Sequence, residues 1–353
     1  VPAYASWLGE LIPPERRGRF FGRRDRIAVA VQLASILIAG LTLSAARPAG
    51  YERAGFAVVF GLALTARLFS VYHLSRLVEP PYPAPPSHER FSLLDFVRSS
   101  PWANFGRFSI YMAIFLAATN MAAPYFAPFM LKDLHFDYGD FTLASCAFLT
   151  AQSVTLTNWG RVADRFGSRR VLQFTGLGLP LVPILWLVST HLVFILVIQL
   201  IAGFLWAGFY LSAANFFFDA VPPTKRTRSV AYHSAFTNTG MVVGALTGGW
   251  IAEHLPAELP GKLAPLFPRL ELISPLQVIF LASGLVRLLV SLSLLPKIRE
   301  AREVPAVSHW QVIVQIIGLT AIRGMLVSVF TGVHPSETPA PPPVKQREPP
   351  RSS

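Results

Sequence analysis

Eight long apolar runs dominate this sequence and restrict the folds that it can adopt. A helix needs about 20 apolar residues to cross a bilayer, and only helices or closed barrels satisfy their backbone hydrogen bonds there. Hydrophobic residues make up 52% of the chain and charged residues 14%, so a soluble fold would lack polar residues to cover its surface. The sequence therefore predicts an all-α, polytopic membrane protein. The runs occupy residues 27–46, 54–74, 108–131, 142–159, 171–189, 192–218, 230–251 and 276–295.

The basic residues gather in alternate loops, which predicts the orientation of the chain. Residues 10–26, 75–107, 160–170 and 222–229, with the stretch after the last run as far as Arg302, hold 20 Lys and Arg, against 5 in the opposite loops. Basic loops stay in the cytoplasm, so these loops and the C-terminal tail are expected on the cytoplasmic side of the plasma (inner) membrane. The net charge of +12 reflects this topology, and nucleic acid is excluded because no basic face belongs to a polar folded domain.

A proline-rich stretch divides the chain into two groups of helices. Residues 75–103 contain five prolines within residues 80–86 and predict a cytoplasmic linker between residues 1–74 and residues 104–298. Residues 299–353 are expected to form a cytoplasmic tail. Its residues 309–333 predict an amphipathic helix on the membrane surface, and its end is proline-rich and expected to be disordered. The alternative is a ninth span, although this would bury Arg323 in the bilayer.

Two cytoplasmic segments match each other at an offset of 209 residues, which indicates an internal repeat. Each contains an acidic residue, a Pro-Pro pair and three basic residues, and a glycine follows in the next run. The pairs are Glu10 with Asp219, Pro13 and Pro14 with Pro222 and Pro223, Arg16, Arg17 and Arg19 with Lys225, Arg226 and Arg228, and Gly40 with Gly249. The offset predicts about 105 residues, or four helices, before Val1, with residues 1–11 ending the fourth. The alternative is that Pro-Pro followed by basic residues is common loop chemistry.

The segment from Gly160 to Arg170, with the sequence GRVADRFGSRR, resembles the loop signature of the major facilitator superfamily. That signature reads Gly-x-x-x-Asp-Arg/Lys-x-Gly-Arg/Lys-Arg/Lys, and Ser168 departs from it where the family has a basic residue. The resemblance implies a twelve-helix transporter built from two bundles, of which this chain supplies helices five to twelve. Residues 1–74 would be the remainder of the first bundle, and residues 104–298 the complete second bundle of six helices.

The resemblance also implies a cytoplasmic gate around this loop. In the family the acid of the loop faces the helix that opens the opposite bundle, here near residues 22–27, and Arg165 would pair with Asp219. Such contacts hold the cytoplasmic side closed and break when it opens. The alternative is that the arginines only anchor the topology. The expected gate residues are Gly160, Asp164, Arg165, Gly167, Arg169, Arg170 and Asp219.

Polar side chains inside the apolar runs are candidates for a substrate path, because burying them in a membrane costs energy. The alternative is that they form hydrogen bonds between helices. Two arginines in the runs, Arg67 and Arg287, are expected to extend to the cytoplasmic surface, and Gly240, Gly244 and Gly248 predict a smooth face for close helix packing. The path candidates are Gln32, Asn120, Tyr125, Gln152, Trp206, Tyr210, Asn215, His233 and Asn238.

The function implied by the resemblance is secondary active transport of a small solute by alternating access. It leaves H+ or Na+ open as the coupling ion and the oligomeric state unknown. Residues 27–46 lack the Gly-Pro pair of the drug–proton antiporters of the family, which predicts against that subgroup. Alternatives are a transporter-like receptor or an inactive fragment. A membrane-embedded enzyme is disfavoured, since no nucleophile–base pair, metal-ligand cluster or cofactor motif occurs, and we expect neither metal nor cofactor.

Overall fold

The computed structural model describes residues 14–76 except 49, and residues 103–300 except 222–225, 257, 264 and 266–267. The chain divides into two units, Val1–His309 and Trp310–Ser353, and every described residue belongs to the first. In the described ranges the regular structure is entirely helical, which confirms the all-α prediction. The predictions for residues 1–13, for most of the linker at 75–103 and for the helix at 309–333 concern residues outside the described ones.

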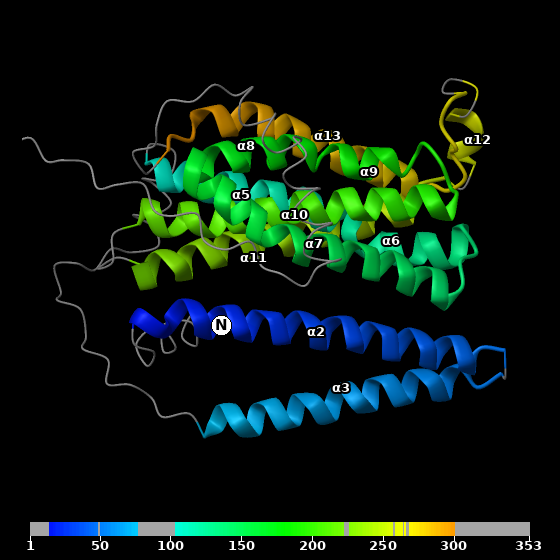
Figure 1. Cartoon of the computed structure of the whole chain (residues 1–353). Coiled ribbons are helices and arrows are strands. Elements are labelled where there is room, and N and C mark those ends of the chain that lie inside the picture. The colour runs from blue at the N-terminus through cyan, green and yellow to red at the C-terminus, as the bar shows by residue number, and fades with distance from the viewer. Residues whose placement is uncertain are drawn as a thin grey trace, which may run out of the picture. The chain divides into compact units, whose positions relative to one another are not determined.

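Two long helices form a hairpin in the first part of the chain, α2 (Pro14–Ala46) and α3 (Glu52–Ser75) (Figure 1). Gly50 turns the chain between them with φ of 73°, a conformation that glycine adopts without strain. Gly55 is buried against α2, because a Cβ atom built on it would lie 2.9 Å from the Ala46 Cβ. The apolar side chains along this hairpin are mostly exposed, as in Leu41 and Phe60, and such faces suit a lipid environment.

The second part of the chain is a bundle of helices that follow one another through short connections (Figure 1). Its first helix changes from α to 3-10 and then to π geometry near Pro124 and Pro128, and proline is a common cause of such irregularity in a helix. The elements are α5 (Asn104–Ala122), η2 (Ala123–Tyr125), α6 (Phe126–Pro128), η3 (Phe129–Asp133), α7 (Tyr138–Phe166), α8 (Ser168–Gly178), α9 (Leu181–Leu185), α10 (Leu192–Ala220), α11 (Arg226–His254), α12 (Leu259–Leu263), α13 (Leu276–Leu294) and η5 (Leu295–Lys297).

Seven of the predicted runs lie in continuous helical segments, of which that at 108–131 changes its helix type, and the eighth is interrupted. The run at 171–189 is split into α8 and the five-residue α9. Pro180 and Pro183 lie in this run, and proline offers no backbone N–H to continue a helix. Among the described residues, five helices are long and apolar enough to cross a membrane: Ile27–Ala46, Glu52–Ser75, Asn104–Asp133, Leu192–Ala220 and Leu276–Lys297. The other three predicted runs are not among these five. The runs at 142–159 and 230–251 lie in helices with more polar residues, and the run at 171–189 contains the break.

Aromatic side chains fill the core of the bundle. Phe115 from α5 stacks on Phe209 from α10 with ring centroids 4.7 Å apart. Phe126 stacks on Phe280 from α13 at 4.3 Å, and Trp186 packs beside both rings. These rings bring α5, α10 and α13 together into one apolar cluster.

Glycines set the closest helix contact in the bundle, between α5 and α11. Cβ atoms built on Gly240, Gly244 and Gly248 would lie 2.4, 1.9 and 2.2 Å from backbone carbonyl oxygens of α5. Those oxygens belong to Ala113, Ala117 and Met121, which repeat at the same spacing of four. The predicted packing face is therefore confirmed, and only glycine fits at these three positions.

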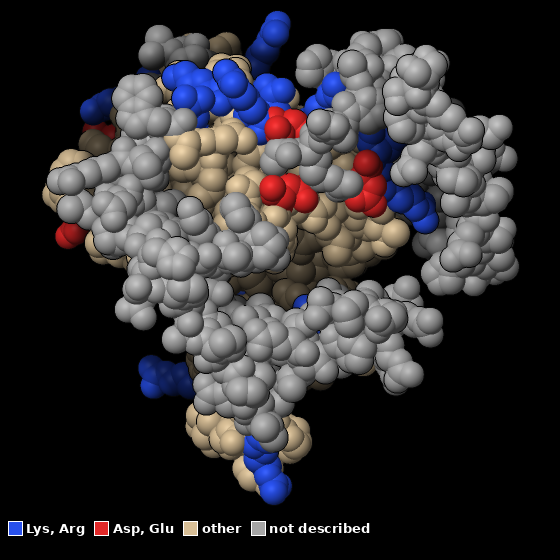
Figure 2. Space-filling model, turned by 90° about the vertical axis from the view of Figure 1, so that its left-hand side faces the viewer, with Lys and Arg blue, Asp and Glu red and all other residues tan. Residues whose placement is uncertain are grey.

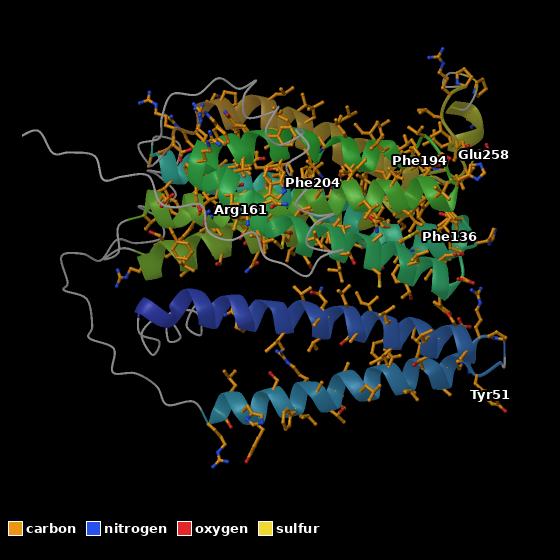
Figure 3. All side chains as sticks on the ribbon, viewed as in Figure 1. Tyr51, Phe136, Arg161, Phe194, Phe204 and Glu258 are labelled. Carbon is orange, nitrogen blue, oxygen red and sulfur yellow. The ribbon has the colours of Figure 1, made fainter. Side chains whose placement is uncertain are left out.

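Basic side chains gather at the end of the bundle where α7 ends and α8 begins. Figure 2 shows this end, with acidic side chains beside the Lys and Arg. Figure 3 places Phe136, Phe194 and Glu258 toward the opposite end from Arg161. Among the described residues, the basic side chains near Arg107, at 161–170, at Arg228 and at 297–299 therefore share one end of the helices. The described basic residues there are Arg107, Arg161, Arg165, Arg169, Arg170, Arg228, Lys297 and Arg299.

Candidate transport site and gate

The predicted gate loop is mostly helical. Helix α7 continues to Phe166 and α8 begins at Ser168, so that Gly167 alone makes the turn. Gly167 is buried and has φ of 90° and ψ of 148°, a region that is essentially restricted to glycine. Ser168 is 1% exposed, so a basic side chain at this position would be buried. This burial accounts for the departure from the family signature at Ser168.

The segment after α13 ties the start of α8 to the start of α5. We call residues 295–300 the strap. The Glu300 carboxylate accepts the backbone N–H of Arg169 at 2.9 Å, where a negative charge is stabilised by the first turn of the helix. The Asn104 side chain forms two hydrogen bonds, both 2.8 Å, with the backbone of Arg299. Sequence reasoning missed Glu300, although an acid within the basic stretch after the last run was a signal.

The charged gate residues do not form the expected pair in this structure. Within the described part of the chain, no ion pair joins Arg165 to Asp219, and both side chains are exposed. The Arg165 guanidinium instead lies over the Phe166 ring, 5.3 Å from its centroid. Asp164 is also exposed. Arg170 donates a long hydrogen bond of 3.5 Å to the Phe166 carbonyl, and Gly160 has room for a Cβ, with Leu211 3.9 Å away.

The predicted path residues separate into three groups: an aromatic pair on α10, His233 on α11, and residues that share no common site. Trp206 and Tyr210 on α10 stack at 4.8 Å, with Phe115 of α5 edge-on to Trp206 at 6.3 Å. On α11, the His233 Nδ1 atom lies 3.0 Å from the Ser109 Oγ atom. The His233 ring stacks on the Phe108 ring of α5.

The other path residues have no shared site. Asn120 donates to the Leu116 carbonyl of its own helix at 2.9 Å. Tyr125, Gln152 and Asn215 are half-buried, whereas Gln32 and Asn238 are exposed.

Arg287 corrects one sequence-based expectation. It does not extend to the surface: it is 3% exposed inside the bundle. It lies on the inward face of α13, one turn from Ser283 and one turn from Ser291, which are both fully buried. Ser283 donates to the Ala118 carbonyl at 2.5 Å, and an Arg287 Nη2 lies 3.5 Å from the Thr119 carbonyl. Arg67 is exposed on α3, and its extension to the cytoplasmic surface stays a prediction.

At the end opposite the gate loop, α2 and α3 contact α7. A Cβ atom built on Gly40 would lie 1.9 Å from Thr142 Oγ1, so the two helices touch without an α2 side chain between them. Tyr138 donates a hydrogen bond from its hydroxyl to the Glu52 carboxylate, and Arg47 lies over the Tyr138 ring at 5.5 Å. The hydrogen bond to Glu52 is the main cause that raises the pKa of Tyr138 above 10.0.

A comparison with known families decides what this arrangement of helices belongs to. The family model described as Major Facilitator Superfamily matches residues 108–333, nearly two thirds of the chain. The chain belongs to the Major Facilitator Superfamily. The resemblance drawn from the gate loop is thereby confirmed.

Two curated relatives within the Major Facilitator Superfamily illustrate the match. Quinolone resistance protein NorA of Staphylococcus aureus (strain MRSA252) is 28% identical over 162 residues, which cover 44% of this chain and 41% of the relative. Multidrug resistance protein 2 of Bacillus subtilis (strain 168) is 29% identical over 126 residues, 35% of this chain and 31% of the relative. The chain thus spans less than half the length of these relatives. No solved structure matches it.

Membership of the Major Facilitator Superfamily makes this chain a multi-pass membrane protein of a transporter family. The family points to a transporter rather than an enzyme. The prediction against drug–proton antiporters stays a prediction, and the printed names of both relatives refer to drug resistance.

Proposed function

We propose that this chain performs secondary active transport of a small organic solute by alternating access. In such a mechanism two helix bundles rock about a central site, which faces each side of the membrane in turn. Family membership and the resistance names of the relatives support transport of a small organic molecule. H+ and Na+ both remain open as coupling ions in this proposal.

The contact between α2 and α7 is the observation that carries the rocking mechanism. Gly40 presents backbone to Thr142, so a helix of the first group meets a helix of the second group closely at this end. Beyond it, the polar contacts of Tyr138 with Glu52 and Arg47 close this end. Polar contacts of this kind exchange with water when the end opens, so they suit a reversible latch.

The gate loop is proposed to act at the opposite, cytoplasmic end. Asp164, Arg165 and Asp219 are exposed and have no ion-pair partner among the described residues, so they are available for contacts that form in another conformation. The strap holds the start of α8 in place by capping it with Glu300. The loop therefore moves with the bundle as a rigid part of it, and Gly167 fixes its turn.

Transport in sealed proteoliposomes tests this proposal. The protein is reconstituted, a panel of organic cations, anions and neutral solutes is supplied, and uptake is compared with and without imposed H+ and Na+ gradients. We expect gradient-dependent uptake of at least one solute, and loss of that uptake in Asp164→Asn with normal membrane insertion. Glu258→Gln is the matched control, because Glu258 is an exposed acid that pairs with Lys262 at 3.2 Å, away from the gate.

Two results would overturn parts of this proposal. If no solute is taken up under any gradient, secondary active transport is wrong for this protein. If uptake occurs and Asp164→Asn leaves it unchanged, the gate role of this loop is wrong while transport stands.

A further inference from the structure

Arg287 is a cation buried in the middle of the membrane helix α13. Its Cα lies 11 residues after Leu276 and seven before Leu294, or about 16 Å and about 10 Å along the helix axis. In the described part of the chain no carboxylate lies within ion-pair distance of it. A charge at this depth is costly and is usually found paired or at a functional site.

The hydrogen bonds of the guanidinium are also incomplete. The Nη2 contact to the Thr119 carbonyl is long, at 3.5 Å, and Nε is buried with no hydrogen-bond partner among the described residues. Guanidinium has five N–H donors in a planar fork that matches the two oxygens of a carboxylate. Leaving a buried charged donor unsatisfied is unfavourable, so an anion that reaches this place would gain from both charge and hydrogen bonding.

Aromatic rings adjoin the same place. Phe115 lies one turn before Thr119 on α5 and packs edge-on against Trp206 of α10, with ring centroids 6.3 Å apart. Tyr210, one turn after Trp206 on α10, is 49% exposed. It stacks on Trp206 at 4.8 Å with 24° between the planes. Through α5, this aromatic pair lies near the place where Arg287 meets Thr119, and it offers a partly exposed surface on which a flat ring can stack.

We propose that Arg287, Tyr210 and Trp206 form a binding site for an aromatic carboxylate. The carboxylate pairs with the Arg287 guanidinium and the ring lies against Tyr210 and Trp206. The proposal deepens the proposed transport function, since it names the substrate class of that same bundle. The competing explanation is a structural brace, in which Arg287 and Ser283 only hold α5 through the Ala118 and Thr119 carbonyls.

Equilibrium binding to the purified protein in nanodiscs tests the site without requiring transport. The probes are benzoate, 1-naphthoate and indole-3-acetate, each paired with its neutral carboxamide. We expect at least one carboxylate to bind about tenfold or more tightly than its amide, because charge-assisted hydrogen bonds differ from neutral ones by this order. Arg287→Gln should remove that preference, and Arg287→Lys should retain part of it, since charge remains but the fork is lost.

Control variants separate binding from bracing. Arg67→Gln makes the same change in the exposed arginine of α3 and should leave the preference unaltered. Trp206→Leu should weaken the carboxylate and the amide alike, without changing their ratio. Melting temperature is measured for every variant, so a brace would be recognised by a fall in stability.

The outcomes are distinct from those of the transport test. The site is wrong if no carboxylate is preferred to its amide, or if the preference survives in Arg287→Gln. If Arg287→Gln fails to fold, the ratio of carboxylate to amide affinity is measured in Arg287→Lys instead. A ratio equal to that of the wild type in this variant would contradict bidentate pairing. If the protein binds the carboxylates but transports no solute, the binding site stands and the proposed transport function is wrong.

Discussion

Replacing Gly244 by alanine should separate α11 from α5 and destabilise the bundle. A Cβ atom at this position would lie 1.9 Å from the Ala117 carbonyl oxygen and 2.6 Å from its carbon. An ordinary close contact between carbon and oxygen needs about 3.3 Å, so the helices must move apart by roughly 1.4 Å. Backbone atoms on the opposing helix cannot rotate away as a flexible side chain would.

The loss of stability in Gly244→Ala follows from the contacts that this movement loosens. Overpacking of a tight interior costs about 1–3 kcal/mol. Alanine regains roughly 1 kcal/mol over glycine in a helix interior. The net cost is therefore about 0–2 kcal/mol, and at about 2–4 °C per kcal/mol the melting temperature should fall by up to about 8 °C.

Gly249→Ala is the matched control on the same helix. A Cβ atom there would meet only the Tyr125 hydroxyl, at an ordinary 3.7 Å. It gains the helix propensity without a clash, so its melting temperature should equal or exceed that of the wild type. Melting is followed by tryptophan fluorescence in one detergent at one scan rate. Equal melting temperatures for the two alanine variants would refute the close-packing argument.

Three further predictions concern the ends of the helices. Gly167→Ala should lower stability by about 1–3 kcal/mol because alanine is strained at φ of 90°, whereas Gly160→Ala should be neutral; equal thermal melting would contradict this. Hydrogen bonds from the Thr190 hydroxyl and backbone lower the pKa of Glu271 below 4.5, so its stabilising contribution is present above pH 4.5 and is lost as pH falls through the lowered pKa. Melting of wild type and Glu271→Gln should therefore differ at pH 7 and converge in acid; a constant difference would oppose this assignment. Glu300→Gln should speed hydrogen exchange in the first turn of α8, since it removes the charge that caps it; unchanged exchange would contradict the cap.

The sequence was sufficient for the helical segments and for the close-packed glycine face. Apolar runs of membrane length and glycines spaced by four are local patterns, and the physics of the bilayer and of helix periodicity translates them directly. The break between α8 and α9 was harder to predict from the sequence, because proline is tolerated in many membrane helices. The actual interruption depends on how Pro180 and Pro183 pack in the bundle.

The candidate site was only partly predictable. Trp206 and Tyr210 are found together because they are one turn apart on one helix. Arg287 was misplaced because its distance from the helix end allowed it to reach the surface, and only the packing of α13 shows which way it faces. The role of Glu300 depends on a contact across 131 residues of sequence, which no local pattern encodes.

Reversible cross-linking of α2 to α7 tests the proposed alternating access most directly. Cysteines replace Gly40 and Thr142 in a Cys146→Ser background, since Cys146 is the chain's single cysteine. Their Cβ atoms would start 2.8 Å apart, about 1 Å closer than in a relaxed disulfide, so a small separation lets the bond form. Transport of the fastest panel solute is measured after oxidation and again after reduction, with each single cysteine variant as a control. The account predicts that oxidation stops transport and reduction restores it; full transport with the disulfide formed would contradict it.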